Sequence, residues 1–391
     1  MKLALFVDRW NETCLGFRGM KLLDTTLREG LQRWGVYFPL EVRVEIARRL
    51  ISLGVEEIEL GVVGDELLPT LIQKVRSFSS QTRLSVWLRL KTKDLALVRD
   101  LGLQNLNLSV PVSPLQLKKR LRLDEGELLA LVRETVLSAR EISPRITLGL
   151  EDVSRARIPF FFQICREAVN AGVWRLRLSD TLGLFNPREV SGLCRRVRKT
   201  FPGVEVVFHG HNDFGLASAN AISALLSGAH WVDVSILGLG ERAGLAKLEE
   251  VVAYLHFRLG QRNYRVEELP SLCRYVAWQA GEVLSEFKPV TGRKIFFCES
   301  GLHVEGLKKS YELYEPFPPE RLGLERRLSL GAKSGRRALS LLLQEWNLRY
   351  PPERLNEIWL EVRKKALLLG RPLEKAEIEG ILDKFTLLSV K

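Results

Sequence analysis

Residues 174–211 read WRLRLSDTLGLFNPREVSGLCRRVRKTFPGVEVVFHGH, which places an amphipathic segment between two short apolar runs. Runs of strand length that alternate with longer helical segments are typical of β-strand–α-helix units on a parallel sheet. The same alternation continues in both directions along the chain. It gives eight strand candidates, at residues 21–26, 56–61, 84–90, 105–112, 146–151, 174–180, 204–211 and 231–238. Eight such units in about 240 residues predict an α/β fold, a TIM (β/α)8 barrel.

The pattern changes after the eighth unit. Helical segments such as ERLNEIWLEVRKKALLLG then surround a loop-rich stretch. We therefore predict three parts: an N-terminal extension over residues 1–19, a catalytic barrel over residues 20–264, and a smaller, mostly helical C-terminal region over residues 265–391.

Composition narrows the class of protein. The 391 residues are 46% hydrophobic, and no apolar run approaches the roughly 20 residues that a membrane helix needs. The apolar start MKLALFV is too short for a signal peptide, so we expect a cytoplasmic protein without a membrane partner. Five scattered cysteines without a CxxC pair fit reduced thiols. The formal charge of +12 comes from dispersed basic residues, which favours anionic small molecules over nucleic acid as ligands.

Ionisable residues gather where the predicted strands end. The seventh ends in HGHND, and side chains two apart on a strand share a face, so His209 and His211 can share one metal ion. The first ends in DTTLREG, where Glu29 offers a carboxylate ligand and Arg28 a positive charge for a substrate oxygen. The alternative is two histidines bonded to loops and an Arg28–Glu29 ion pair at the rim.

Other strand ends add a base and binding groups. GLEDVSR ends the fifth strand and SDTLG the sixth, which gives Glu151 as a candidate base and Thr181 as a polar contact. The alternative is that polar residues in these turns cap the helices that follow. Arg89, on the third strand, is a candidate partner for a distal substrate carboxylate. Its alternative role is to hold the carboxylates beside the metal.

The motifs DTTLREG, GLEDVSR, SDTLG, HGHND and GLGERAG occur in this order on a predicted TIM barrel. The set resembles the acyl-CoA-condensing branch of the DRE-TIM metallolyases, which comprises isopropylmalate, citramalate and homocitrate synthases. The resemblance runs from about residue 20 to residue 340 and includes SGLHVEG (300–306) and LYEPFPPERLG (313–323). The segments VWLR (86–89) and SVPVS (109–113) are most similar to the nitrogen-fixation type of homocitrate synthase.

The resemblance implies an acyltransferase of the EC 2.3.3 class. Such an enzyme condenses acetyl-CoA with a 2-oxo acid, 2-oxoglutarate in the homocitrate type, and then hydrolyses the thioester. It implies that Glu29, His209 and His211 bind a divalent metal, Mg, Mn or Zn. It implies that Arg28 stabilises the alkoxide and that Glu151 helps to enolise acetyl-CoA.

The resemblance also implies roles outside the metal centre. Gln32 would line the substrate pocket, and Thr181 would contact the substrate carboxylate. His303 and Tyr314 match positions that reach the active site from the partner subunit, so the resemblance implies a homodimer whose C-terminal region covers the partner's active site.

The chain departs from the family pattern at five positions: Leu31, Pro114, Leu245, Ala332 and Lys333. Leu245 replaces an Asn that can join the metal shell. Alternatives therefore stay open: a citramalate, Re-type citrate or isopropylmalate synthase, the related lyases, or a catalytically silent paralogue that binds a CoA ester or a partner.

Overall fold

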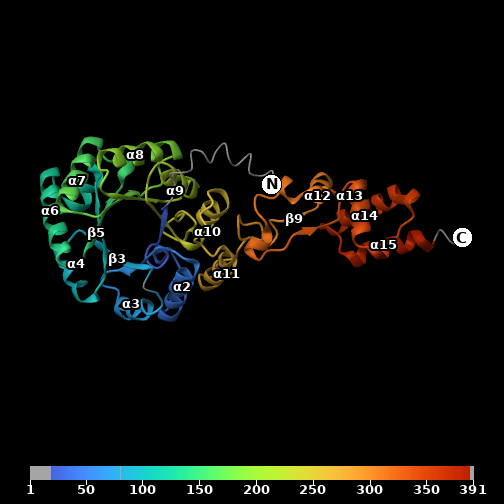
Figure 1. Cartoon of the computed structure of the whole chain (residues 1–391), viewed down its shortest axis with the longest axis horizontal. Coiled ribbons are helices and arrows are strands. Elements are labelled where there is room, and N and C mark those ends of the chain that lie inside the picture. The colour runs from blue at the N-terminus through green and yellow to red at the C-terminus, as the bar shows by residue number, and fades with distance from the viewer. Residues whose placement is uncertain (1–18, 80, 388–391) are drawn as a thin grey trace. The chain divides into compact units, whose positions relative to one another are not determined.

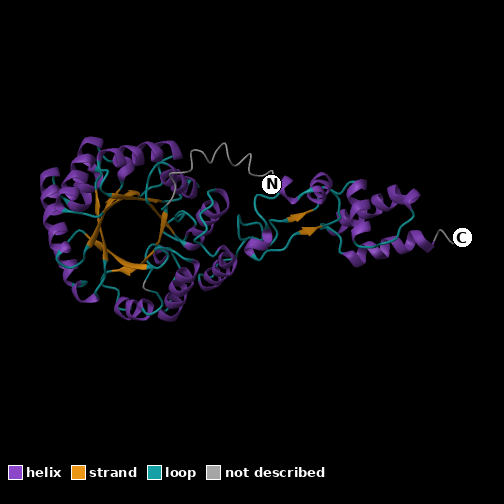
Figure 2. Cartoon of the chain, viewed as in Figure 1, coloured by secondary structure: helices purple, strands orange, loops and turns teal. Residues whose placement is uncertain are grey.

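A computed structural model describes residues 19–79 and 81–387. Eight parallel strands close into a barrel in sequence order, and helices surround the ring (Figures 1 and 2). The strands are β1 (Lys21–Asp24), β2 (Glu57–Val62), β3 (Arg83–Arg89), β4 (Asn105–Pro111), β5 (Arg145–Glu151), β6 (Arg175–Asp180), β7 (Glu205–Gly210) and β8 (Trp231–Val234). Each overlaps one predicted run, so the predicted TIM barrel is confirmed.

Most of the helices that follow these strands bury one face, and only the short α5 (Pro114–Gln116) has no buried residue. They are α2 (Leu40–Leu53), α3 (Leu68–Arg76), α4 (Thr92–Ala96), α5 (Pro114–Gln116), α6 (Glu125–Arg140), α7 (Ile158–Ala171), α8 (Pro187–Thr200), α9 (Ala217–Leu226), α10 (Leu248–Ala253) and α11 (Leu269–Gln279). Local chemistry sets several of their ends. Asp124 and Asn186 form capping boxes at the starts of α6 and α8, and α2 ends at Gly54 in the left-handed region.

The barrel interior is unusually polar. Four inward side chains from alternate strands, one layer of the barrel, are charged or amide groups: Glu59, Asn107, Arg177 and Asp233. All four are buried, and hydrogen bonds connect them across the barrel. The apolar core lies instead between the sheet and the surrounding helices, where Leu22, Ile58 and Leu106 are fully buried.

The chain divides into two compact units between Leu284 and Ser285. The second contains β9 (Phe297–Cys298), α12 (Gly301–Lys309), β10 (Arg327–Leu328), α13 (Arg336–Glu345), α14 (Leu355–Leu369) and α15 (Lys375–Leu387). The predicted boundary after residue 264 lies earlier than this division, because α11 packs against α2 in the barrel unit. The predicted extension over residues 1–19 lies outside the described residues except for Gly19.

Two further predictions from composition can be compared with the structure. None of the described helices is both long and apolar enough to cross a membrane. Of the cysteines in the described residues, Cys165, Cys194 and Cys273 are buried free thiols and Cys298 is half-buried; Cys14 lies outside the described residues.

Candidate active site

A cavity of about 290 Å³ opens at the carboxyl ends of the barrel strands. In a TIM barrel this is the end at which the strand-to-helix loops converge. Seven of the predicted site residues line the cavity: Arg28, Glu29, Gln32, Glu151, Thr181, His209 and His211. They come from the ends of β1, β5, β6 and β7, so folding brings together groups that lie far apart in the sequence.

The two histidines face one another inside this cavity. Their Nε2 atoms are 3.4 Å apart, and Oε1 of Glu29 lies 3.8 Å from Nε2 of His211. One ligand atom from each of the three residues lies within 4.8 Å of the others, and all three residues are buried. Two imidazole nitrogens and a carboxylate oxygen in this arrangement are suited to a divalent metal ion.

Asp233 on β8 orients the first histidine. Its Oδ2 lies 2.7 Å from Nδ1 of His209, which directs Nε2 towards the cavity. A carboxylate bonded to the far nitrogen is the usual support for a metal-binding imidazole. Arg177 donates to the same carboxylate over 2.6 Å, so the support is itself held in place.

The second histidine is neutral. Burial, and next the neighbouring His209, lower the pKa of His211 to about 3. Its Nδ1 is buried without a partner in the described part of the chain. Since a metal binds the neutral imidazole, this electrostatic setting keeps the ligand in its binding form.

Glu29 is held between Arg28 and the histidines. Arg28 donates Nη1 to Oε2 of Glu29 and Nε to Glu59 over 2.6 Å. Burial acts to raise the pKa of Glu29, but the guanidinium of Arg28, the largest opposing cause, outweighs it and lowers that pKa. Gln32, with its amide nitrogen towards this carboxylate, lies 3.0 and 3.2 Å from the two oxygens. Glu29 is thus kept ionised, as a ligand must be.

One neutral hydroxyl and one guanidinium position the carboxylate of Glu151, the candidate base. Ser109 donates to Oε1 of Glu151 over 2.9 Å, and Arg120 donates to Oε2 over 2.6 Å. Both donors line the cavity. The carboxylate therefore has a fixed direction in a site open to a substrate.

Thr181 has its hydroxyl proton available. The hydroxyl oxygen accepts from the backbone N–H of Asp152 over 2.8 Å, so the proton can be donated into the cavity. Arg242, from the loop after β8, donates to the carbonyl of Thr181 over 2.6 Å and to Asp213. The close turn in this loop requires glycine, because a Cβ on Gly244 would lie 1.8 Å from the carbonyl oxygen of Gly238.

Comparisons with known proteins agree with this geometry. The family model described as HMGL-like matches residues 19–276, and the one described as homocitrate synthase post-HMGL domain-like matches residues 290–367. This chain belongs to the HMGL-like family. The predicted membership of the DRE-TIM metallolyases is confirmed, and so is the class of enzyme, an acyltransferase-type synthase.

Several relatives match nearly the whole chain. The 2-phosphonomethylmalate synthase of Streptomyces rubellomurinus is 35% identical over 93% of this chain and 98% of its own length. The 2-isopropylmalate synthase 2 of Caldanaerobacter subterraneus subsp. tengcongensis is 33% identical over 91% of this chain and 93% of its own. The homocitrate synthase of Frankia alni is 36% identical over 84% of this chain and 93% of its own.

Solved structures support the fold. The HMG-CoA lyase of Bacillus subtilis superposes with a TM-score of 0.61 at 21% identity, over 68% of this chain and 95% of its own.

One predicted site residue of this HMGL-like barrel does not reach the cavity. Arg89 makes a bidentate ion pair with Asp94 at 2.8 Å for both bonds, and its side chain is exposed. Arg89 therefore lies outside the cavity in this structure, and its contact with substrate stays a prediction. Arg28 and Arg177 instead hold the carboxylate of Glu59, whose pKa burial acts to raise but the two guanidinium groups keep well below its usual range.

Three further acidic residues at strand ends serve the turns of the HMGL-like barrel. Asp24 accepts from Thr26, and Asp180 accepts from the backbone N–H groups of Leu184 and Phe185. Asp152 accepts from Arg155 and Ser113. All three carboxylates stabilise the turns after their strands, and none of the three caps a helix with its side chain.

Leu245 and Pro114 are accommodated without distortion. Leu245 is buried and pairs through its backbone with His211, so its apolar side chain adds no ligand to the centre. Pro114 occupies the first turn of α5, where a missing N–H has no cost, and Ser113 caps that turn.

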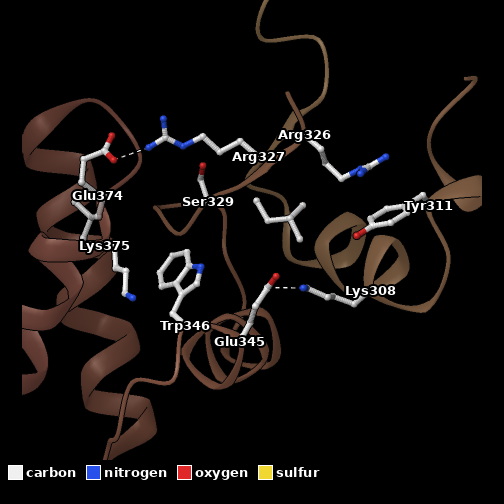
Figure 3. A pocket seen from close by; sticks show the side chains of 11 residues that line it. Lys308, Tyr311, Arg326, Arg327, Ser329, Glu345, Trp346, Glu374 and Lys375 are labelled. Atoms are coloured by element: carbon white, nitrogen blue, oxygen red, sulfur yellow. Dashed lines mark hydrogen bonds and ion pairs between the residues drawn. The ribbon is translucent and has the colours of Figure 1, made fainter. Parts of the chain in front are cut away.

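His303 and Tyr314 lie together on the second unit. Their ring centroids are 4.3 Å apart, and both side chains are exposed. His303, Ala332 and Lys333 line a cavity of about 750 Å³ within that unit. A second cavity there, of about 390 Å³, has its charges paired, Lys308 with Glu345 and Arg327 with Glu374 (Figure 3).

The sequence did not predict the supporting residues of the site, namely Glu59, Ser109, Arg120, Arg177 and Asp233. One pattern could have found some of them: charged residues two apart, as in RLRLSD and EIELGV, within runs that must be buried on both faces. No local pattern distinguishes Arg120, which comes from a short helical segment, Leu117–Leu121, between β4 and α6.

Proposed function

We propose that this chain is a homocitrate synthase, which condenses acetyl-CoA with 2-oxoglutarate and releases homocitrate and CoA. The observation that carries the proposal is the cavity at the carboxyl end of the barrel, where a three-residue metal site lies beside a positioned carboxylate and a guanidinium. The homocitrate-synthase type of second unit and the 36% identity to a homocitrate synthase support this choice of 2-oxo acid.

Glu29, His209 and His211 would hold the metal, for which Mg, Mn and Zn are the candidates. A divalent cation there supplies the positive charge that polarises the ketone of the 2-oxo acid. The residues fit such an ion because His209 is directed by Asp233, His211 is neutral, and Glu29 is ionised.

Arg28 faces the same space. Its Nε is bound to Glu59 and its Nη1 to Glu29, which leaves the Nη2 hydrogens for a substrate oxygen. As the ketone becomes an alkoxide, a fixed guanidinium stabilises the new charge without reorganisation. The Thr181 hydroxyl donates to the carboxylate of the 2-oxo acid and so orients the ketone.

Glu151 takes the proton from the methyl group of acetyl-CoA. Ser109 and Arg120 hold the two carboxylate oxygens at the cavity wall, so the base is aimed before the thioester arrives. Arg120 is also the exposed guanidinium of the cavity, which makes it our replacement for Arg89 as the partner of the distal carboxylate. Hydrolysis of the thioester then releases CoA.

The active enzyme is a cytoplasmic homodimer in this proposal, and the partner's second unit supplies His303 and Tyr314. Support comes from the exposed His303–Tyr314 pair and from apolar side chains in loops after β1 and β7. Trp34 is 97% exposed, Tyr37 87% and Phe214 70%, which is unusual for such side chains unless another surface covers them.

The decisive experiment measures free thiol released from acetyl-CoA, with Mg or Mn present and an EDTA control. The panel of acids is glyoxylate, pyruvate, oxaloacetate, 2-oxoisovalerate and 2-oxoglutarate. We expect metal-dependent release with 2-oxoglutarate. Release with another acid alone would replace the name by citramalate, citrate or isopropylmalate synthase. No release with any acid, in protein that holds no stoichiometric metal, would point to a silent paralogue.

The shared active site is tested separately by co-expressing two inactive chains. His209→Ala removes a metal ligand, and Tyr314→Phe removes a hydroxyl from the second unit. If the site is completed in trans, mixed dimers regain one intact site and hence part of the activity. Mixed dimers as inactive as their parents would contradict this arrangement.

A further inference from the structure

The amino end of the barrel, opposite the catalytic cavity, carries an excess of positive charge. We call its two lowest inward layers the barrel floor. Its members are the first inward residues of the eight strands: Lys21, Glu57, Arg83, Asn105, Arg145, Arg175, Glu205 and Trp231. Alternate strands supply alternate layers in a barrel of this type.

Side-chain direction follows from the alternation along each strand. Ser85 and Asn107 bond to one another inside the barrel, so Arg83 and Asn105, two residues earlier, face inwards as well. Thr147 bonds to Arg175 inside the barrel, which gives Arg145 the same direction. Three adjacent strands, β3, β4 and β5, therefore present Arg83, Asn105 and Arg145 to the same space.

The acids of the barrel floor are already used. Glu57 makes a bidentate ion pair with Arg175 at 2.8 and 2.9 Å. Glu205 accepts from Lys21 over 3.2 Å and from the indole N–H of Trp231. Among the barrel-floor residues, all of which the structure describes, Arg83 and Arg145 are left without an ion pair or a hydrogen bond.

These two guanidinium groups lie over the same aromatic ring. Their central carbons are 5.3 Å and 5.4 Å from the centroid of the same indole, that of Trp174. Burial, and next the charge of Arg145, lower the pKa of Arg83. Nη1 of Arg83 is buried and has no partner in the described residues. Glu57 and Glu205 oppose this repulsion at Arg83, but both acids are bonded to other donors. An anion between the two guanidinium groups would reduce the repulsion further.

Asn105 gives an independent indication of a ligand. Its side chain is 1% exposed, and neither its amide nitrogen nor its amide oxygen has a partner among the described residues. It pairs in register with Arg145 on β5 and with Ser85 on β3. A buried amide without hydrogen bonds is costly, so a group that accepts from its N–H is expected beside it.

We propose that the barrel floor binds a small oxyanion, a phosphate or a carboxylate, between Arg83 and Arg145, with the amide of Asn105 as a third donor. Guanidinium groups bind such anions through paired N–H bonds, and a primary amide adds a neutral donor. The site is distinct from the catalytic cavity: on β4, Asn105 lies four residues, or about 13 Å of strand, before Ser109 at the cavity wall.

Titration calorimetry on the full chain tests the site, with inorganic phosphate and malonate as probes at constant ionic strength. The test variants are Arg83→Gln, Arg145→Gln and Asn105→Leu, and the matched control is Arg188→Gln with Arg195→Gln, two exposed cations of α8. We expect one site per chain, and each arginine variant should weaken binding by about tenfold or more. Asn105→Leu should weaken binding while leaving the net charge unchanged.

Two checks keep the result interpretable. Thiol release from acetyl-CoA at the opposite end should persist in all variants, which shows that they fold. Asp8 and Glu12 lie outside the described residues, so an Asp8→Asn, Glu12→Gln chain is included. Binding that is equal in wild type and Arg83→Gln, no binding of either probe, or binding that appears only after Asp8 and Glu12 are replaced would overturn the proposal. The two probes distinguish a phosphate site from a carboxylate site.

Discussion

Asp24 makes the stability of the barrel depend on pH in a direction opposite to that of most acidic residues. The carboxylate is fully buried at the end of β1. Burial raises its pKa from 3.8 to about 7, and Asp233 and Glu249 add to the rise, while hydrogen bonds from Thr26 oppose it. Between pH 3.8 and about pH 7, the folded protein therefore keeps a proton on Asp24 that the unfolded chain has already released.

The sign of the effect follows from this difference. The protonated Asp24 carboxyl stabilises the folded state fully below pH 3.8, and this stabilisation is lost as the pH rises towards 7. Each unit of difference between the folded-state and unfolded-state pKa corresponds to about 1.4 kcal/mol. At high pH, the ionised Asp24 carboxylate therefore lowers the free energy of unfolding by about 4 kcal/mol. Between pH 5 and pH 8 the cost grows by about 2.5 kcal/mol.

Asp24→Asn removes the titration and keeps the size of the side chain. We expect its free energy of unfolding, relative to wild type, to rise by about 2.5 kcal/mol from pH 5 to pH 8, or about 5–10 °C in melting temperature. Urea unfolding of EDTA-treated protein, followed by tryptophan fluorescence, measures this. The control is Asp100→Asn at an exposed position. A difference between Asp24→Asn and wild type that stays constant over this pH range would refute the reasoning.

Three other substitutions test the site. Glu59→Gln leaves two buried guanidinium groups without their shared counterion and should destabilise the barrel by about 3 kcal/mol or more in urea unfolding, whereas exposed Glu134→Gln should not. Arg89→Ala should leave the KM for the 2-oxo acid unchanged, because its guanidinium is engaged by a neighbouring carboxylate outside the cavity; a severalfold rise would restore it to the site. Asp233→Asn should weaken metal affinity by about 10- to 100-fold in equilibrium dialysis, and unaltered affinity would show that His209 does not need this support.

The sequence alone determined the barrel and the core of the site. The eight runs are recognisable because each carries apolar residues on the face that packs against the helices, and the intervening helices have their own period. His209 and His211 were predictable as a pair, because side chains that are two residues apart on a strand point to the same face. Their nearness to Glu29 followed from the fold, since all strand ends of a barrel meet at one rim.

The tertiary structure alone decided which charged residues meet inside the barrel. Glu59, Arg177 and Asp233 come from three different strands, and their contacts depend on how the strands are staggered when the sheet closes. Arg89 had a suitable position in the sequence but found its partner in the next helix, Asp94. A side chain pairs with whichever opposite charge the closed barrel brings within reach, and the stagger that sets this distance is a property of all eight strands together.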